Sequence, residues 1–143
     1  MRKSEEAKGR VSEEEQGAPR FRSYQDLKLW QAAMEVAEAC YRATNGFPRE
    51  ELFVTVSQIR RASISIPANV AEGWGREGTR EFIQYLRIAQ GSIKELETLV
   101  LFSIRVELMG SETGEKLLEN LAEVSRMARA LISSLQRKLK KDG

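Results

Sequence analysis

The chain has 143 residues, a net charge of +2 and no histidine, and Cys40 is its only cysteine. One domain accommodates this length, and the lack of histidine excludes Ser-His-Asp and Cys-His catalysis, His-ligated metals and the commonest general base. A lone cysteine excludes an internal disulfide and favours a reducing, cytoplasmic location.

Residues 1–20 are mostly charged, polar or small, and Val11 is their only sizeable apolar side chain after Met1. Such a segment cannot bury enough surface to offset the loss of chain entropy, so we expect a disordered tail followed by one domain over residues 21–143. The tail lacks the apolar stretch of a secretion signal, and no part of the chain has the ~18 consecutive apolar residues of a membrane span. We therefore expect no membrane contact.

The first helix is predicted to begin after Ser23, a residue suited to capping a helix N-terminus, and to end at Gly46 and Pro48. Its apolar residues recur at alternating steps of three and four, which places them on one helix face. These residues are Leu27, Trp30, Met34, Ala37, Tyr41 and Thr44.

A second helix is predicted from about Glu50 to Glu72, with Gly73 ending it. Pro67 should kink this helix because proline removes a backbone hydrogen bond, and we expect Asn69 to satisfy the backbone groups that Pro67 frees. The inward positions are predicted to be Leu52, Val56, Ile59, Ser63, Ile66 and Val70.

A third helix is predicted from Thr79 to about Leu108, and Gly91 interrupts it at a cost of about 1 kcal/mol relative to alanine. Close approach of another backbone would compensate that cost. The inward residues are predicted to be Phe82, Leu86, Ala89, Ile93, Leu96, Val100 and Ser103. A fourth helix follows the turn at Gly110, with Leu117, Leu121, Val124, Ala128, Leu131 and Leu135 inward.

All four apolar patterns repeat in sevens, and the links between them are short. Short links make consecutive helices run antiparallel. The sequence therefore predicts an all-α protein, an antiparallel up-down-up-down four-helix bundle.

Cations recur every seven residues on the third helix, at Arg80, Arg87 and Lys94. Two interpretations stay open: an ordinary solvated helix face, or a surface that binds a polyanion with strong salt dependence. Residues 137–141 carry four further cations, which would extend such a surface or complement the dipole at a helix C-terminus.

Arg60 and Arg61 are adjacent on the second helix. One interpretation is structural pairing with a carboxylate, for which Glu95 and Glu97 are the candidates. The other is direct contact with phosphate.

The six residues from Gly73 to Gly78 match the pattern G-x-G-x-x-G of dinucleotide-binding loops. That function needs a preceding strand, whereas here a helix comes first. The pattern instead favours a turn between helices that uses glycine at positive φ. Arg76 and the free amides at the start of the third helix could hold a phosphate there, and Trp74 is the aromatic residue expected to face a partner.

A motif of nineteen residues carries a family resemblance, QIRRASISIPANVAEGWGR from Gln58 to Arg76. It resembles the signature of the bacterial four helix bundle proteins, also called 23S rRNA-intervening sequence proteins. Further matches in the same order lie at Trp30-Gln31 with Ala33, Phe47-Pro48 with Glu51, Phe82 with Leu86, and Ala89 to Ser92 with Glu95-Leu96. Together they cover about residues 21–110.

The resemblance implies a four-helix bundle that assembles as a ring, commonly a pentamer, without catalytic residues. Some members are encoded within 23S rRNA genes. The related accessory variability determinants of diversity-generating retroelements form basic pentameric barrels that bind nucleic acid and a reverse transcriptase. By analogy, Arg60, Arg61 and Arg76 are candidates for anionic contacts.

We therefore predict a bacterial, non-enzymatic, self-assembling adaptor that contacts RNA or DNA and a polymerase-type protein such as a reverse transcriptase, and that needs no cofactor. The alternative is a protein-binding scaffold with no nucleic-acid contact. The predicted nucleic-acid-binding residues are Arg60, Arg61, Arg76, Arg80, Arg87 and Lys94.

Overall fold

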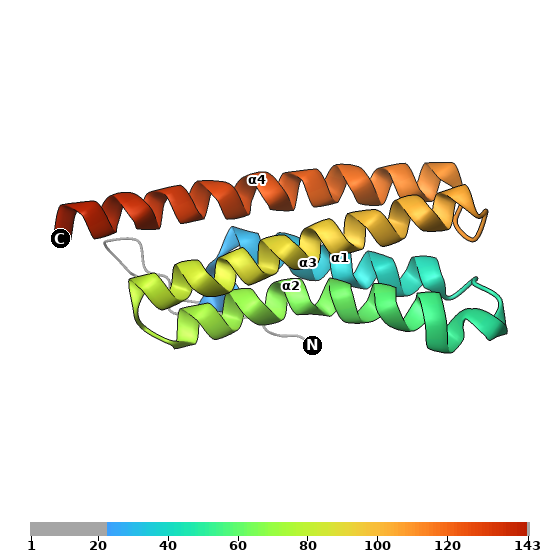
Figure 1. Cartoon of the computed structure of the whole chain (residues 1–143), viewed down its shortest axis with the longest axis horizontal. Coiled ribbons are helices and arrows are strands. Elements are labelled where there is room, and N and C mark those ends of the chain that lie inside the picture. The colour runs from blue at the N-terminus through green and yellow to red at the C-terminus, as the bar shows by residue number, and fades with distance from the viewer. Residues whose placement is uncertain (1–22, 143) are drawn as a thin grey trace, which may run out of the picture.

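The structure is a computed structural model that describes residues 23–142. The predicted tail over residues 1–20, and its boundary with the domain, lie outside these residues. Four long helices make up most of the described chain: α1 (Lys28–Thr44), α2 (Ser57–Gly75), α3 (Thr79–Arg105) and α4 (Ser111–Asp142). They lie side by side, and consecutive helices run in opposite directions (Figure 1).

The predicted all-helical bundle is confirmed, since residues 23–142 contain four long helices and no strand. The other elements are short: η1 (Tyr24–Asp26), η2 (Arg49–Glu51) and the π-helical η3 (Leu52–Val56). None of the helices between residues 23 and 142 has an apolar stretch long enough to cross a membrane.

The core matches the sequence prediction best on α3. Its seven predicted inward residues, from Phe82 to Ser103, are all buried. The six apolar ones pack with Ile59, Ile66 and Val70 of α2 and with inward residues of α4 in a single apolar cluster. Seven-residue spacing therefore located this face correctly.

The predicted inward face of the first helix is confirmed at Leu27, Ala37 and Thr44, which are buried, and is wrong at Tyr41. The buried residues are Leu29, Ala33, Val36, Ala37, Cys40 and Thr44. Trp30 instead meets the ring of Tyr24 edge-on at the side of the helix, and Tyr41 is 39% exposed. Small side chains face the core because they let α1 approach its neighbours, and the large rings lie at its border. Ser23 caps the short η1 through its Oγ rather than α1 itself.

The predicted start of the second helix is wrong in detail. The chain passes through a 3-10 turn and then a π turn before α2 begins at Ser57. This change in winding buries Thr55 and Val56 and leaves Leu52, a predicted inward residue, 47% exposed.

The prediction that Gly73 ends the second helix is also wrong, because α2 continues to Gly75. Gly73 is needed for close packing: a Cβ there would lie 2.8 Å from Cβ of Tyr85 and 2.9 Å from Cδ1 of Phe82. In the turn after α2, the residue at positive φ is Glu77 (66°), not a glycine.

The close backbone approach predicted at Gly91 does not occur. A Cβ on Gly91 would meet nothing within 4 Å, and the residue is exposed. The tight glycine contact between α3 and α4 lies instead at Gly114, which packs against Ile104.

Pro67 is buried, and α2 continues through it. The amide of Asn69 donates to the carbonyl and hydroxyl oxygens of Ser65, at 2.8 and 3.0 Å. The carbonyl that proline deprives of its helical donor is that of Ser63, four residues back, so the expected role of Asn69 is wrong. Asn69 instead orients Ser65, whose hydroxyl lies 2.7 Å from that of Ser92 and joins α2 to α3.

Candidate nucleic-acid interface

The three cations predicted as a row on α3 are all exposed. Seven residues advance a helix by about 10.5 Å, so Arg80, Arg87 and Lys94 span about 21 Å. Lys94 forms an ion pair with Glu97 at 3.2 Å. Arg80 and Arg87 make no hydrogen bond or ion pair with any residue from 23 to 142.

Two contacts fix how α4 lies against α3. Ile104 packs on Gly114 near one end, and Phe82 and Leu135 line the same hollow near the other. The helices are therefore antiparallel neighbours, and Arg87 is level with Leu131.

The stretch of α4 opposite the α3 cations carries a second row of exposed cations, Arg126, Arg129, Arg137 and Lys140. These residues recur at helical spacing, as one side of a helix requires. Arg126 pairs with Glu123 at 2.6 Å, and the other three make no ion pair within the described chain.

Both rows lie on the outer, solvent-exposed sides of the adjacent helices α3 and α4. On α3, Ser92 faces α2, and Lys94 comes two residues later, about 200° around the helix. On α4, Asn120 faces the groove toward α1, and Arg129 comes nine residues later, on the opposite side. We call the two rows the α3–α4 cationic face: Arg80, Arg87, Lys94, Arg126, Arg129, Arg137 and Lys140.

Sequence reasoning named the α3 row and the terminal cations but missed Arg126 and Arg129. The sequence did contain a signal for this row. Positions 126, 129, 133, 137 and 140 follow helical spacing, and all of them except Ser133 are Arg or Lys. What the sequence lacked was the register between α3 and α4.

Arg60 is not on this face. Its Nε donates to Thr44 Oγ1 at 2.9 Å, and its Nη2 donates to Asn45 Oδ1 at 3.1 Å. Its guanidinium also lies 4.3 Å from the ring centre of Tyr41. The prediction that Arg60 pairs with Glu95 or Glu97 is therefore wrong. Arg60 fastens α2 to the C-terminus of α1, where a cation is stabilised by the helix dipole.

Arg61 lies on α2, and Arg76 directly follows its last residue. Arg61 is exposed and has a weak contact to Ser57 Oγ at 3.5 Å. Arg76 donates to Glu72 at 3.1 Å and to the Tyr85 hydroxyl at 2.9 Å. These contacts, with that of Glu72 the largest, raise the pKa of Arg76 above its ordinary value. Of the six residues predicted to bind nucleic acid, Arg80, Arg87 and Lys94 therefore lie in one row. Arg60, Arg61 and Arg76 lie apart from it, each with its own contacts.

The turn before α3 already holds an acidic side chain. Oε1 of Glu81 would lie 2.9 Å from a Cβ on Gly78, so this carboxylate folds over the start of the helix. A carboxylate here is favoured by the helix dipole and competes with any phosphate. Trp74 is half-buried and packs edge-on against Phe82 with centroids 6.2 Å apart.

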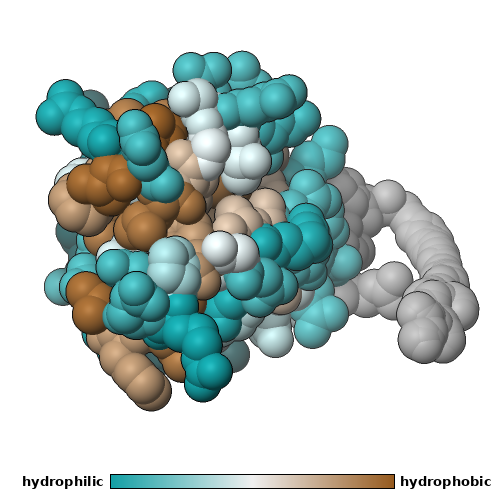
Figure 2. Space-filling view, turned by 90° about the vertical axis from the view of Figure 1, so that its right-hand side faces the viewer, coloured by the Kyte–Doolittle hydropathy of each residue, from teal (hydrophilic) through white to brown (hydrophobic). Residues whose placement is uncertain are grey.

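The opposite end of the bundle carries an apolar surface. Phe53 is 88% exposed, and about half of the surface of five further side chains is open. Figure 2 looks onto this end, where apolar residues gather on one side. We call them the apolar end patch: Leu52, Phe53, Val54, Leu101, Phe102 and Val106.

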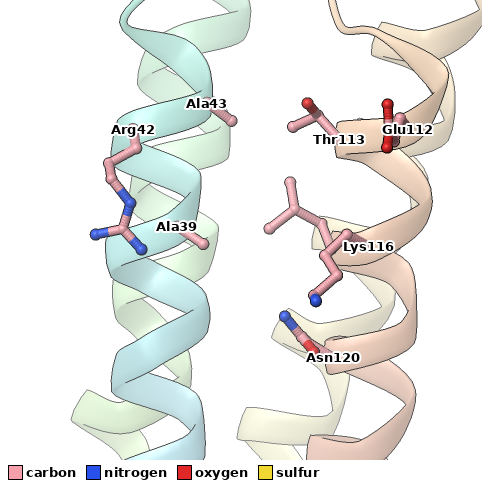
Figure 3. Close-up of a pocket in the computed structure, with 8 residues that line it drawn as sticks. Ala39, Arg42, Ala43, Glu112, Thr113, Lys116 and Asn120 are labelled. Carbon is pink, nitrogen blue, oxygen red and sulfur yellow. The ribbon is translucent and has the colours of Figure 1, made fainter.

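A groove of about 500 Å³ lies between α1 and α4. Ala39 and Ala43 leave it hollow on one wall, and Lys116 and Asn120 point across from the other (Figure 3). Glu112 at its rim offsets the cations, so the groove has no single sign of charge. Within residues 23–142, no three Cys, Asp or Glu side chains gather as metal ligands would.

Comparison with known proteins agrees with this fold. A crystal structure of a protein with unknown function from the S23 ribosomal protein family of Bacteroides thetaiotaomicron VPI-5482 superposes with a TM-score of 0.69. The two sequences are 25% identical, and the match covers 73% of this chain and 95% of the other. A search of curated proteins gave no match.

The sequence model of one family, described as 23S rRNA-intervening sequence protein, matches residues 25–130. Neither this family nor the similar crystal structure indicates a catalytic activity. Because the match spans most of the chain, the protein belongs to the family of 23S rRNA-intervening sequence proteins.

Proposed function

We propose that this protein is a non-enzymatic, self-assembling adaptor that associates with RNA or DNA. The observation that carries the proposal is the α3–α4 cationic face, where two rows of exposed cations lie side by side. Phosphate contacts of Lys and Arg supply most of the affinity of sequence-independent nucleic-acid binding.

The charge of α4 is divided along its length. Up to Glu123 it carries Glu112, Glu115, Glu119 and Glu123 against Lys116, and from Arg126 onward it carries the cations of the face. Although the net charge is only +2, the positive charges of α4 are therefore concentrated toward one end of the molecule. Such a surface attracts a polyanion more strongly than the net charge indicates.

The apolar end patch supports self-assembly. Large exposed apolar patches on soluble proteins mark interaction sites, because leaving them in water is unfavourable. Copies that meet through this patch would gather several cationic faces into one polyvalent surface. A ring of five copies is the assembly that the family resemblance suggests, and a retroelement reverse transcriptase is the protein partner that it suggests.

The same patch favours a second candidate function, a protein-binding scaffold without nucleic-acid contact. In that case the patch would take a protein partner, and the cationic face would be an ordinary solvated surface. The two functions differ in whether nucleic acid binds at low salt.

A gel-shift titration with structured RNA and with DNA, at low and moderate salt, tests the main proposal. We expect retardation at low salt that weakens steeply as salt rises. No retardation of either nucleic acid at low salt would reject nucleic-acid association and leave the scaffold.

Light scattering tests self-assembly on the same preparations. We expect a mass several times 16.2 kDa, and a shift toward the monomer in the double variant Phe53→Ser, Phe102→Ser. A wild-type chain that stays monomeric at high concentration would reject the assembly.

A further inference from the structure

We infer that the α3–α4 cationic face takes a double-stranded nucleic acid, held by its two phosphate backbones, in preference to a single strand. This inference rests on the proposed function and specifies its ligand. It comes from two properties of the face: its cations form two rows, and it contains no aromatic side chain.

The two rows have similar lengths. Lys94 lies fourteen positions after Arg80, and Lys140 lies fourteen positions after Arg126, so each row spans about 21 Å. They lie on packed helices, whose axes are typically about 8–10 Å apart. The face is therefore a pair of parallel lines of positive charge rather than one line.

A duplex also presents two lines of charge, both negative. Its phosphate strands border the grooves, and the minor groove of B-form DNA is about 6 Å wide. A duplex also carries about one charge per 1.7 Å of axis, twice the density of one of its strands. Both rows can contact phosphate at once on a duplex, whereas one strand can follow only one row.

None of the exposed aromatic rings of residues 23–142 lies among these cations, and the half-buried Trp74 lines a hollow with Leu135 and Lys138 at one end of the face. Proteins that bind single strands combine cations with exposed aromatic rings on which bases stack. The exposed rings of residues 23–142 lie elsewhere: Phe53 and Phe102 belong to the apolar end patch, and Tyr41 lies on α1 against Arg60 of α2. Tyr85 accepts a hydrogen bond from Arg76 on the α2 side of α3, and Trp74 packs on Phe82.

Fluorescence anisotropy with the full chain tests the inference. The probes are a DNA duplex and an RNA duplex of about 20 base pairs, longer than the face at about 3.4 Å per pair, and the isolated strands of each. We expect at least one duplex to bind about tenfold more tightly than its strands. Strands that bind as well as both duplexes would overturn the inference but keep the proposed function, and no binding of any probe would overturn both.

Matched variants test the two rows separately. Arg87→Gln and Arg129→Gln each remove one cation, one from each row. Each should weaken duplex binding several-fold and reduce the slope of log K against log salt by about 1. Arg42→Gln removes an exposed cation at the groove between α1 and α4 and should change neither quantity.

The variants also define the failures. If Arg129→Gln binds duplex like the wild type while Arg87→Gln does not, α3 acts alone and the two-row inference is overturned. If Arg42→Gln weakens binding as much as the others, overall charge explains the binding and the face is rejected. Unchanged circular dichroism shows that each variant is folded.

Discussion

Gly73 of α2 lies directly against Tyr85 of α3, so close that a single added carbon would stand 2.8 Å from the Tyr85 Cβ. The neighbouring atoms are Cβ of Tyr85 and Cδ1 of the Phe82 ring. The Tyr85 Cβ is bonded directly to the backbone, so it cannot move away unless α3 itself shifts. Gly73→Ala should therefore destabilise the bundle by about 1–3 kcal/mol through overpacking, more than the roughly 1 kcal/mol that alanine contributes to a helix. Urea denaturation measures this as a lower midpoint.

Gly91 provides the matched control. It also lies inside a helix, but a Cβ there meets nothing within 4 Å. Gly91→Ala should raise the free energy of unfolding by about 0.5–1 kcal/mol. A loss of stability in Gly91→Ala, or none in Gly73→Ala, would contradict the packing described for these two positions.

Ser103 is fully buried, and its hydroxyl has no hydrogen-bond partner in the described chain. Removing an unsatisfied buried hydroxyl relieves a desolvation cost of about 1–3 kcal/mol, so Ser103→Ala should be neutral or stabilising by about 1 kcal/mol. Ser63 is equally buried, but its hydroxyl donates to the Arg60 carbonyl at 2.9 Å. Ser63→Ala should therefore not stabilise, and thermal unfolding of the pair distinguishes the two hydroxyls.

Burial raises the pKa of the Cys40 thiol from 9.0 to about 12. Between these values the unfolded chain ionises at Cys40 while the folded chain does not, so stability is lost as pH rises above 9. The loss attributable to Cys40 between pH 8 and pH 10 is about 1.4 kcal/mol. Urea denaturation of the wild type and of Cys40→Ala at pH 8 and pH 10 measures this contribution. The free energy of unfolding of Cys40→Ala should fall less than that of the wild type, by about 1.4 kcal/mol.

The same state of Cys40 predicts its reactivity. The thiolate is the nucleophile, and in the folded protein Cys40 is buried and protonated at pH 8. A thiol-specific reagent should therefore modify Cys40 only as fast as the protein unfolds around it. Rapid modification without denaturant would mean that Cys40 is accessible.

Arg60 and Arg87 should behave in opposite ways. Arg60→Gln loses the bonds to Thr44 and Asn45 and should destabilise the protein by about 1–2 kcal/mol without changing the salt dependence of nucleic-acid binding. Arg87→Gln should leave stability unchanged within about 0.5 kcal/mol and reduce that salt dependence. Urea unfolding and fluorescence anisotropy of both variants check this. If Arg60→Gln reduced the salt dependence and Arg87→Gln reduced the stability, Arg60 would belong to the binding surface and Arg87 would not.

Sequence periodicity predicted the helix number and the whole inward face of α3, because each of its inward residues is apolar or small at seven-residue spacing. The same rule was only half right for the first helix, where Leu27, Ala37 and Thr44 are buried but Trp30, Met34 and Tyr41, which also have helical spacing, are not. Large rings satisfied the pattern, but small residues such as Ala33 and Cys40 allow the close packing. The π turn before α2 has no signature in residue type and could not be predicted.

For the candidate site, the spacing of Arg80, Arg87 and Lys94 was sufficient to predict a row. The role of Arg60 depended on which residues of α1 come near it, and that depends on the register between helices. The same register brings Arg129 beside the α3 cations. Local spacing therefore predicts single rows, whereas pairs of rows require the packed structure.

The placement of Phe53 and Arg80 near opposite ends of the bundle means that neither surface obstructs the other. A neighbour that holds the molecule by Phe53 leaves Arg80 and Arg137 open to a long, rigid ligand. The helices would then serve as spacers, and lengthening α3 and α4 by whole turns should change how far apart two captured partners are held without altering how tightly either is held.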